Sequence, residues 1–577
     1  MNIISLSETR TLWERWKFNA EKFPDRDAII HWVAGEEPFR WTFKSLLETA
    51  EKFAYQLKKE NVKPGEVCAI IIRHNRYFYP LYLAISSIGA LPAVLAYPNP
   101  RLHPDKFRQG LSGMSQRSGL DWIFTERELE DIIRPFVESV ESTIGNLFFP
   151  LEWDLEVEHV TKITAQIHAS RASIESLDPV LLQHSSGTTG LQKPVVLSHK
   201  AILVHVQNLA DIMKLSDEDK MINWLPLYHD MGLIAAFHMP LAFGIPSVQI
   251  DPFEWVLAPA LFLESVSKER GTIAYLPNFA YNLMADKIHD EELEGFSLES
   301  LRMLINCSEP VRASSHERFV NKFEQYGFKA ASLSAAYGLA ETTFAVTQTE
   351  PGKAPTVLKV DRQKLAGGIV ELTDDVSNIK KCVSSGKLLN GCEIKIVDDN
   401  SNLIPVENVG EIAIKSVSMF DGYRNYPEKT AAVVDEEGWY YSGDFGFVYH
   451  DELYVIGRKK DIIIVAGKNI YPEDIEDAIG KVDGVIPGRV IAFGEEDDEL
   501  GTEQVSVVAE TKIEDTAELK KLRIAIIRAG MGMDVNIHDV YLVPPRWLIK
   551  SSAGKPSRKA NKGRIISGKD EKVWGEK

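Results

Sequence analysis

Segments with helical spacing of apolar residues alternate with short apolar runs through the first half of the chain. Thr42 is a candidate cap for a helix whose apolar side chains recur every three or four positions over residues 46–57. Residues 67–72 then read as a short buried strand, and a helix over residues 81–88 and a strand over residues 93–97 repeat the order. Repeated alternation of this kind predicts α/β layers with mainly parallel strands.

The second half has a different character, and the length of the chain requires more than one hydrophobic core. At 577 residues the chain is too long for a single core. After about Pro351 the strands are short and separated by acidic turns, as at residues 411–414. A final unit begins near Gly457, with a strand over residues 462–465 and a helix entered at Tyr471-Pro472. We therefore expect a large N-terminal domain of layered α/β subdomains plus a β-rich subdomain, and a small α+β C-terminal domain.

The net charge of −18 limits the partners that the chain can bind. Nucleic acids and membrane surfaces are polyanionic, so we do not expect a general binder of either. An acidic protein can still bind ATP where local Lys, Arg and backbone amide groups face the phosphates.

Cysteine usage and the start of the chain favour a cytoplasmic protein. The four cysteines are far apart and show neither a C-x-x-C pair nor the Cys/His spacing of a zinc site; they are Cys68, Cys307, Cys382 and Cys392. They fit buried side chains in a reducing compartment. Residues 1–16 carry scattered charges and no apolar core, so the pattern of a signal peptide is not visible.

Residues 231–248 form the one stretch that is long and apolar enough to suggest a membrane span. Within it, His238, Pro240, Gly244 and Pro246 are typical of a buried helix followed by a strand. We therefore expect no transmembrane segment.

The strongest local signal is Ser185-Ser186-Gly187-Thr188-Thr189-Gly190, followed by Lys193. Small residues allow backbone amides to close around phosphate oxygens, while the hydroxyls and one Lys supply further donors. The run is not a Walker A loop, because no Gly-Lys-Ser/Thr follows Gly190. Taken alone, it is equally compatible with a flexible polar turn.

Four further motifs follow in the chain. Ala336-Tyr337-Gly338-Leu339-Ala340-Glu341 joins an aromatic surface, a tight turn and a carboxylate, and Tyr441-Ser442-Gly443-Asp444 places a carboxylate on a turn suited to ribose hydroxyls. Gly457-Arg458-Lys459-Lys460-Asp461 lies at the suspected domain boundary, and Ser551-Ser552-Ala553-Gly554-Lys555 places a Lys after a small, flexible run. Taken singly, each is better read as a solvated surface turn or tail.

In this order, the motifs resemble the adenylate-forming superfamily of acyl-CoA ligases, nonribosomal adenylation domains and luciferases, and the match covers nearly the whole chain. Three segments resemble signatures of the fatty acyl-AMP ligases more narrowly: residues 224–233, residues 277–283 and Ser308-Glu309-Pro310-Val311. Ordinary core packing would account for the same apolar residues. Residues 352–381 look like an insertion that those ligases carry in the large domain; the alternative is a long surface loop.

The resemblance implies a role for each matching residue. The triphosphate would be surrounded by Ser185, Ser186, Gly187, Thr188, Thr189, Gly190 and Lys193. The adenine pocket would be formed by Ser308, Glu309, Ala336, Tyr337 and Gly338, and the ribose held by Asp444 and Arg458. Glu341 would bind Mg²⁺, and Lys460 falls at the family's hinge, which divides the chain into residues 1–459 and a mobile domain of residues 460–577. The acyl group would lie beside His229, Asp230, Met231, Pro277, Asn278, Phe279 and Tyr281. Lys555, with His229, is the expected catalytic residue, and it bridges the acid carboxylate and the α-phosphate.

The implied reaction joins a fatty acid to AMP from ATP, and in this family the acyl group then passes to an acyl carrier protein. A CoA ligase of the same fold, an aromatic or amino acid substrate, and an inactive nucleotide-binding regulator are the alternatives. The sequence departs from the family pattern at two places. Pro194 follows Lys193 where a Gly is usual, and its missing amide alters the path of the phosphate loop. Cys307-Ser308 stands where Gly-Ala is usual in the adenine pocket.

Overall fold

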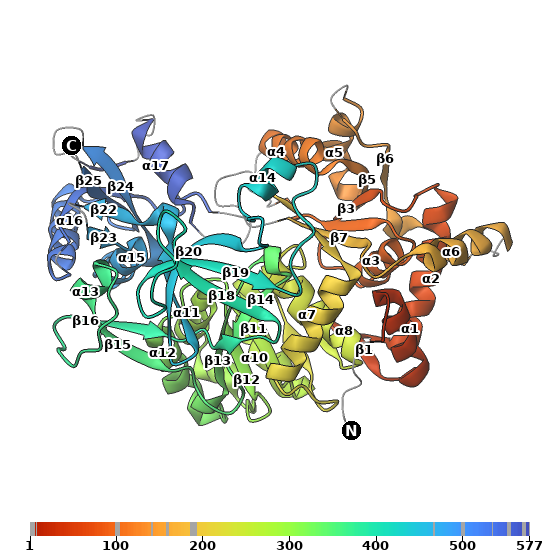
Figure 1. The fold of residues 1–577 in the computed structure, drawn as a ribbon, viewed down its shortest axis with the longest axis horizontal. Coiled ribbons are helices and arrows are strands. Elements are labelled where there is room, and N and C mark those ends of the chain that lie inside the picture. The colour runs from red at the N-terminus through yellow and green to blue at the C-terminus, as the bar shows by residue number, and fades with distance from the viewer. Residues whose placement is uncertain are drawn as a thin grey trace.

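We describe the fold from a computed structural model of the chain. It describes residues 6, 8–98, 104–139, 142–156, 161–184, 193–465, 468–497, 502–533, 535–550, 556–567 and 573–575. Figure 1 shows a broad molecule in which the N-terminal third and the C-terminal region lie at opposite ends, with the central strands between them.

A nine-stranded sheet forms the centre of the molecule, in the order β17-β14-β13-β12-β11-β9-β10-β1-β2. Its six inner strands, from β13 to β1, are parallel neighbours, and antiparallel strands close both edges. The strands are β1 (Asp27–Trp32), β2 (Phe39–Thr42), β9 (Met221–Asn223), β10 (Ser247–Ile250), β11 (Ile273–Leu276), β12 (Met303–Asn306), β13 (Leu333–Gly338), β14 (Ala345–Gln348) and β17 (Lys387–Leu388). The predicted parallel α/β layering is confirmed.

A second, fully parallel sheet has the order β4-β3-β5-β6. It contains β3 (Val67–Ile71), β4 (Leu91–Val94), β5 (Leu120–Thr125) and β6 (Asn146–Phe148). The helices of this part are α1 (Leu12–Lys22), α2 (Phe43–Lys59), α3 (Phe78–Ser87), α4 (Pro104–Ser118), α5 (Glu130–Val137) and α6 (Thr161–Ser173). Thr42 caps α2 as predicted, because its hydroxyl accepts from the Ser45 amide at 3.1 Å.

Further helices of the large region come later in the chain. They are α7 (His199–Ile212), α8 (Met239–Phe243), α9 (Pro252–Leu257), α10 (Ala260–Glu269), α11 (Asn278–Lys287), α12 (Ala313–Phe323) and α14 (Pro427–Ala431). A hairpin of β7 (Pro179–His184) and β8 (Pro194–Ser198) joins the two sheets in sequence.

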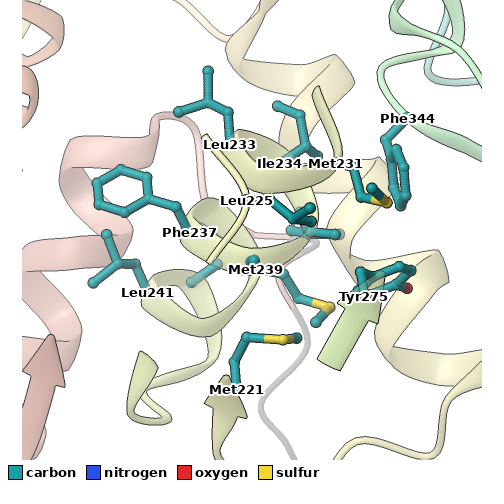
Figure 2. Close-up of a cluster of buried hydrophobic side chains, with 14 of the residues drawn as sticks. Met221, Leu225, Met231, Leu233, Ile234, Phe237, Met239, Leu241, Tyr275 and Phe344 are labelled. Atoms are coloured by element: carbon teal, nitrogen blue, oxygen red, sulfur yellow. The ribbon is translucent and has the colours of Figure 1, made fainter. Parts of the chain in front are cut away.

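The apolar stretch 231–248 is buried, as expected, but begins with an unpredicted π-helix over Met231–His238, followed by α8 and β10. Figure 2 shows Met231 beside Phe344 on one side of it and Phe237 and Leu241 on the other. Gly232 permits the close approach of the turn before it, because a Cβ there would lie 2.6 Å from the Pro226 carbonyl oxygen. No helix in the described part of the chain is long and apolar enough to cross a membrane.

The β-rich part is an antiparallel sheet of β18 (Cys392–Val397), β19 (Gly410–Ser416), β20 (Tyr440–Tyr449) and β21 (Glu452–Arg458). The segment 352–381, predicted to be an insertion, is not a structureless loop. It supplies β15 (Val357–Asp361), α13 (Arg362–Ala366) and most of β16 (Ile379–Val383), and β15 and β16 pair as a two-stranded sheet. Its apolar side chains pack with those of β20, β21 and Tyr471 in one buried cluster.

The C-terminal region has a separate hydrophobic core. It contains the 3₁₀ turn Lys459–Asp461 (η8), β22 (Ile463–Val465), β23 (Lys468–Ile470), α15 (Pro472–Ile479), β24 (Val485–Asp497), β25 (Thr502–Thr511), α16 (Thr516–Met531), β26 (Ile537–Val543) and α17 (Arg558–Ile566). Tyr471 is the residue before α15 and Pro472 its first residue, as predicted. The fold class, α/β with a small α+β C-terminal region, is confirmed.

Candidate active site

A cleft of about 1710 Å³ lies between the large region and the C-terminal region. We refer to it below as the cleft. Ten of the residues predicted from the motifs line it: Asn278, Phe279, Ser308, Glu309, Ala336, Tyr337, Gly338, Asp444, Arg458 and Lys460. These residues come from segments up to about 180 positions apart in the chain, so the fold has gathered them into one concave surface.

The predicted phosphate loop, Ser185 to Gly190, lies outside the described residues, but the hairpin that holds its ends is clear. His184 ends β7 and is paired with Pro194, the first residue of β8. Proline is tolerated at the first position of a strand, and its carbonyl oxygen accepts from the Arg424 amide at 2.9 Å. The departure at Pro194 is therefore accommodated where the loop rejoins the sheet. Burial lowers the pKa of His184 to about 4.

Lys193 and Glu341 lie on either side of a buried tyrosine that sequence reasoning missed. The Tyr423 hydroxyl donates to Glu341 Oε1 at 2.6 Å and accepts from Lys193 Nζ at 3.2 Å. The Lys193 ammonium also lies 4.5 Å from the centre of the Tyr423 ring. Burial lowers the pKa of Lys193, while Glu341 opposes that shift. Glu341 is buried, with 7% of its surface exposed. The Tyr423 hydroxyl lies between the Glu341 carboxylate and the Lys193 ammonium.

Tyr440 belongs to the same cluster. Burial raises the pKa of Tyr440, and the nearby Glu341 and Tyr423 raise it further. Tyr440 directly precedes the 441–444 motif, which is the only sequence signal that could have drawn attention to it. Tyr423 has no such signal, since its partner Glu341 lies 82 positions away.

Asp444 and Arg458 face each other across two adjacent strands. They are register partners in β20 and β21, and Arg458 Nε lies 3.3 Å from Asp444 Oδ1. The Tyr337 hydroxyl donates to the other carboxylate oxygen at 2.8 Å. The Asp444 carboxylate raises the pKa of Arg458. The motif at 441–444 was expected on a turn; this was wrong, because cross-strand pairing extends β20 through it.

The end of β13 and the segment after β12 form the wall beside this pair. A Cβ on Gly338 would lie 1.9 Å from the Phe344 carbonyl oxygen, so only glycine fits where the chain turns back toward β14. Ser308 has a φ of 72°, a left-handed conformation uncommon for a residue with a side chain. Its hydroxyl lies 3.7 Å from Met231 Sδ, which joins the expected adenine and acyl subsites.

The expected acyl-binding residues fall into two groups. Phe279 and Asn278 line the cleft, and Phe279 makes edge-on contacts with Trp224 and Trp255, which stack on each other at 3.5 Å. His229, Asp230, Met231, Pro277 and Tyr281 do not line the cleft. Tyr281 is fully buried and donates to the Leu304 carbonyl oxygen at 3.1 Å, so it faces the core.

His229 and Asp230 form a compact pair at the start of the π-helix. His229 Nδ1 lies 2.6 Å from Asp230 Oδ1, and the same oxygen accepts from the Met231 amide at 2.8 Å. Gln183, at the end of β7, donates to the Tyr228 carbonyl oxygen at 2.7 Å. The pair is therefore attached to the strand that leads into the phosphate loop.

On the C-terminal side, Lys460 lies in the turn η8 and lines the cleft. Burial lowers the pKa of Lys460, and repulsion from the Arg458 cation lowers it further. Lys555 lies outside the described residues, but its neighbours Lys550 and Pro556 are paired in an isolated bridge. The insertion also contacts this region: Lys380 Nζ lies 2.7 Å from Asp474 Oδ2 and 4.3 Å from the centre of the Tyr471 ring.

Comparison with known proteins places this geometry in context. Residues 16–424 match a family model described as AMP-binding enzyme. A protein of Mycobacterium tuberculosis named a probable long-chain-fatty-acid–AMP ligase, FadD30, is 31% identical over 411 residues, which cover 66% of this chain and 68% of that protein.

Two solved structures share the fold over nearly the full length. One, from a study of fatty acyl-adenylate ligases from E. coli and L. pneumophila, has a TM-score of 0.87 at 24% identity, with 97% of this chain and 99% of that chain covered. The other is a fatty acyl-adenylate ligase from L. pneumophila in complex with acyl adenylate and pyrophosphate. It has a TM-score of 0.73 at 26% identity, with 98% of each chain covered.

Proposed function

Because the chain belongs to the family of AMP-binding enzymes, we propose that it is a fatty acyl-AMP ligase, which uses ATP to convert a fatty acid to acyl-AMP and pyrophosphate. The observation that carries the proposal is that Tyr337, Asp444 and Arg458 contact one another in the cleft that Ser308 also lines. An aromatic face beside a carboxylate is what the binding of a nucleoside requires. The likeness to fatty acyl-AMP ligases supports a fatty acid as the substrate.

In this proposal a carboxylate oxygen of the acid attacks the α-phosphorus of ATP. The new O–P bond forms as the bond to the bridging α–β oxygen breaks, and pyrophosphate leaves with the electron pair. The protein forms no covalent bond, so positioning and charge stabilisation supply the rate. Lys555 and Lys193 are the cations that we assign to the α-phosphate and to the leaving phosphates, and His229 to the acid carboxylate.

Asp444 and Arg458 are assigned to the ribose, with Tyr337 on the adenine. Asp444 Oδ2 accepts one hydrogen bond from Tyr337 and Oδ1 pairs with Arg458, and the carboxylate retains lone pairs for a ribose hydroxyl. The aromatic face of Tyr337 and the backbone of Gly338 and Ser308 form the adenine wall. The Ser308 hydroxyl lies close to Met231 Sδ, which supports an acyl group that lies next to the nucleotide.

Glu341 is the residue that would hold Mg²⁺. The described residues contain no cluster of three or more metal-ligating side chains. Magnesium in nucleotide sites is commonly held by one or two carboxylates together with substrate phosphates, and a single buried glutamate fits that pattern. When bound, the ion neutralises phosphate charge. Tyr423 fixes one oxygen of Glu341 and so leaves its orientation defined.

We propose an acyl carrier protein as the acceptor of the acyl group, with the region 460–577 turning about Lys460 between the two steps. The insertion 352–381 supports this choice over CoA, because Lys380 joins it to α15 in the C-terminal region. The four cysteines are free and buried, which supports a reducing cytoplasm as the site of the reaction.

The test is product analysis by mass spectrometry with purified protein, ATP, Mg²⁺ and a panel of fatty and aromatic acids, with and without CoA. Acyl-AMP that accumulates without acyl-CoA supports the proposal and identifies the preferred chain length. Efficient acyl-CoA formation would establish the CoA ligase instead. ATP binding without an adenylate from any acid would point to a regulator that lacks catalysis.

A further inference from the structure

Arg558, the first residue of α17, is surrounded by three carboxylates in the C-terminal region. Its guanidinium binds both oxygens of Glu476, with Nε and Nη2 distances of 2.9 and 2.8 Å. Nη1 donates to Asp461 Oδ2 at 2.8 Å, and Nη2 lies 2.9 Å from Glu473 Oε1. The four side chains are 13–19% exposed, so water screens these charges only weakly.

The three carboxylates come from two elements that meet at the proposed hinge. Asp461 lies in η8, directly after Lys460, and the two glutamates lie on α15. Arg558 thereby fastens the start of α17 to the turn about which the C-terminal region is proposed to rotate. The contact spans 97 positions of sequence, and no backbone pairing between η8 and α17 replaces it among the residues that the structure describes.

The segment that carries Lys555 is attached to the same place. Lys550 and Pro556, on either side of it, are bridge partners. Ile549 and Asn561 exchange two hydrogen bonds of 2.8 and 2.9 Å, between the backbone of one and the side-chain amide of the other. The residues that flank this segment are therefore bonded to each other and to the start of α17, where Arg558 is the first residue.

We propose that Arg558 is a positioning residue for adenylate formation, which holds the start of α17, three positions after Lys555 in the chain, at a fixed distance and angle from the hinge. The inference rests on the proposed function, since it acts through Lys555. Arginine suits the task because its planar fork binds one carboxylate with two parallel bonds and still reaches a second. A catalytic group displaced by about 1 Å typically loses on the order of a hundredfold in rate, so a loosened α17 lowers catalysis without removing any group that touches substrate.

The experiment compares Arg558→Lys with Arg564→Lys in the full-length protein. Arg564 lies on the same helix and is a matched control, because it donates to the Trp547 carbonyl oxygen at 2.6 Å and stacks over the Trp547 ring at 4.0 Å, away from the hinge. Acyl-AMP formation gives kcat and the KM for ATP, and thermal unfolding gives Tm. Glu476→Gln, which removes the bidentate partner and leaves Arg558 in place, is a second variant in case Arg558→Lys fails to fold.

We expect Arg558→Lys to lower kcat by about ten- to a hundredfold, with the KM for ATP within about twofold of wild type. Glu476→Gln is expected to give a smaller loss of the same kind, and Arg564→Lys to keep near-normal kcat. An unchanged kcat in Arg558→Lys, or an equal loss in Arg564→Lys, would overturn the inference while wild-type turnover upholds the proposed function. A rise in KM that accounts for the whole loss would also overturn it, since that result places Arg558 in ATP binding. A wild-type protein that forms no acyl-AMP would overturn both.

Discussion

The two faces of the cleft hold their charged groups in different ways. On the large-region face, Asp444 and Arg458 lie across paired strands, and outside the cleft lining the neutral hydroxyl of Tyr423 stands between Lys193 and Glu341. On the C-terminal face, one cation, Arg558, holds three carboxylates directly. The backbone of the first face is placed by sheets that would persist without the charges. On the second face, the contact between η8 and the start of α17 is made by the charges themselves.

The difference matches what each face is proposed to do. A preformed nucleotide site gains from groups already in place, because ordering them on binding would cost affinity. A region that turns as one body needs its own parts fixed to each other more than to the large region. Each of the following predictions concerns a change in one face, and the measurement shows whether the other face is affected.

The largest effect is expected from Lys555→Ala, which removes the proposed catalytic cation from the C-terminal region. Removal of one such charge contact lowers the rate by roughly a hundredfold or more, about 3 kcal/mol of transition-state stabilisation. ATP binding should remain close to wild type, because the nucleotide is assigned to the opposite face. Pyrophosphate release measures the rate, and calorimetry measures the affinity for ATP.

The control for that variant is Lys520→Ala, which removes an exposed lysine from α16. It should leave both measurements unchanged. Near-normal pyrophosphate release by Lys555→Ala would contradict the assignment of the catalytic cation.

Acid should weaken the large region more than the C-terminal region. Burial lowers the pKa of His184, His199 and His316 to about 4, and that of His205 and His238 to about 3, and all five lie in the large region. The unfolded chain binds these protons near pH 6.5, so this stability is complete above about pH 6.5. It is lost as the pH falls toward 4 for the first three histidines and toward 3 for the other two. Each histidine contributes up to about 1.4 kcal/mol per pH unit in that window.

Hydrogen exchange measured by mass spectrometry at pH 7, 6 and 5 tests this, after correction for intrinsic rates. Peptides from the central sheet should lose protection more steeply than those from β24 to β26. Equal loss in both regions would show that the buried histidines do not control the acid response.

Asp444→Asn should raise the KM for ATP by about tenfold, because a charge-assisted hydrogen bond is worth about 1.5–3 kcal/mol and part of it is kept by the amide. The strands β20 and β21 should stay paired, so Tm is expected to change little. Steady-state kinetics and thermal unfolding measure the two quantities. Asp399→Asn is the control, since Asp399 is 80% exposed and pairs with Lys459 at 3.0 Å. An unchanged KM for ATP would remove Asp444 from the nucleotide site.

The smallest effect is expected from Tyr423→Phe. The ring keeps its packing, but the hydroxyl between Lys193 and Glu341 is lost, and one net hydrogen bond of about 1 kcal/mol corresponds to roughly a fivefold fall in kcat. In a titration with Mg²⁺, half-maximal activity should require a higher concentration of the ion, because Glu341 is no longer oriented. Tyr426→Phe, three residues along, is the control. A loss in Tm with unchanged magnesium dependence would reduce Tyr423 to a packing role.

Local signals in the sequence predicted the elements well where the cause is local. Thr42 caps α2, and Tyr471-Pro472 opens α15, because capping depends on residues one to three positions apart. The parallel central sheet followed from helix–strand alternation. The motif at 441–444 was misread as a turn, since its small residues have turn propensity but the partner strand that extends it is decided elsewhere. The π-helix at Met231–His238 had no signal, because its extra residue per turn is imposed by packing.

The sequence by itself determined which residue types are available for nucleotide chemistry and in what order, and ten of them line one cleft. Only the tertiary structure decided how the charges are neutralised. Tyr423 reaches Glu341 across 82 positions and Arg558 reaches Asp461 across 97, and neither contact has a periodicity or a spacing that a sequence could reveal. The physical reason is that caps, helical periodicity and short apolar runs are written in residues a few positions apart, whereas a buried charge must be paired by whatever group the fold brings beside it.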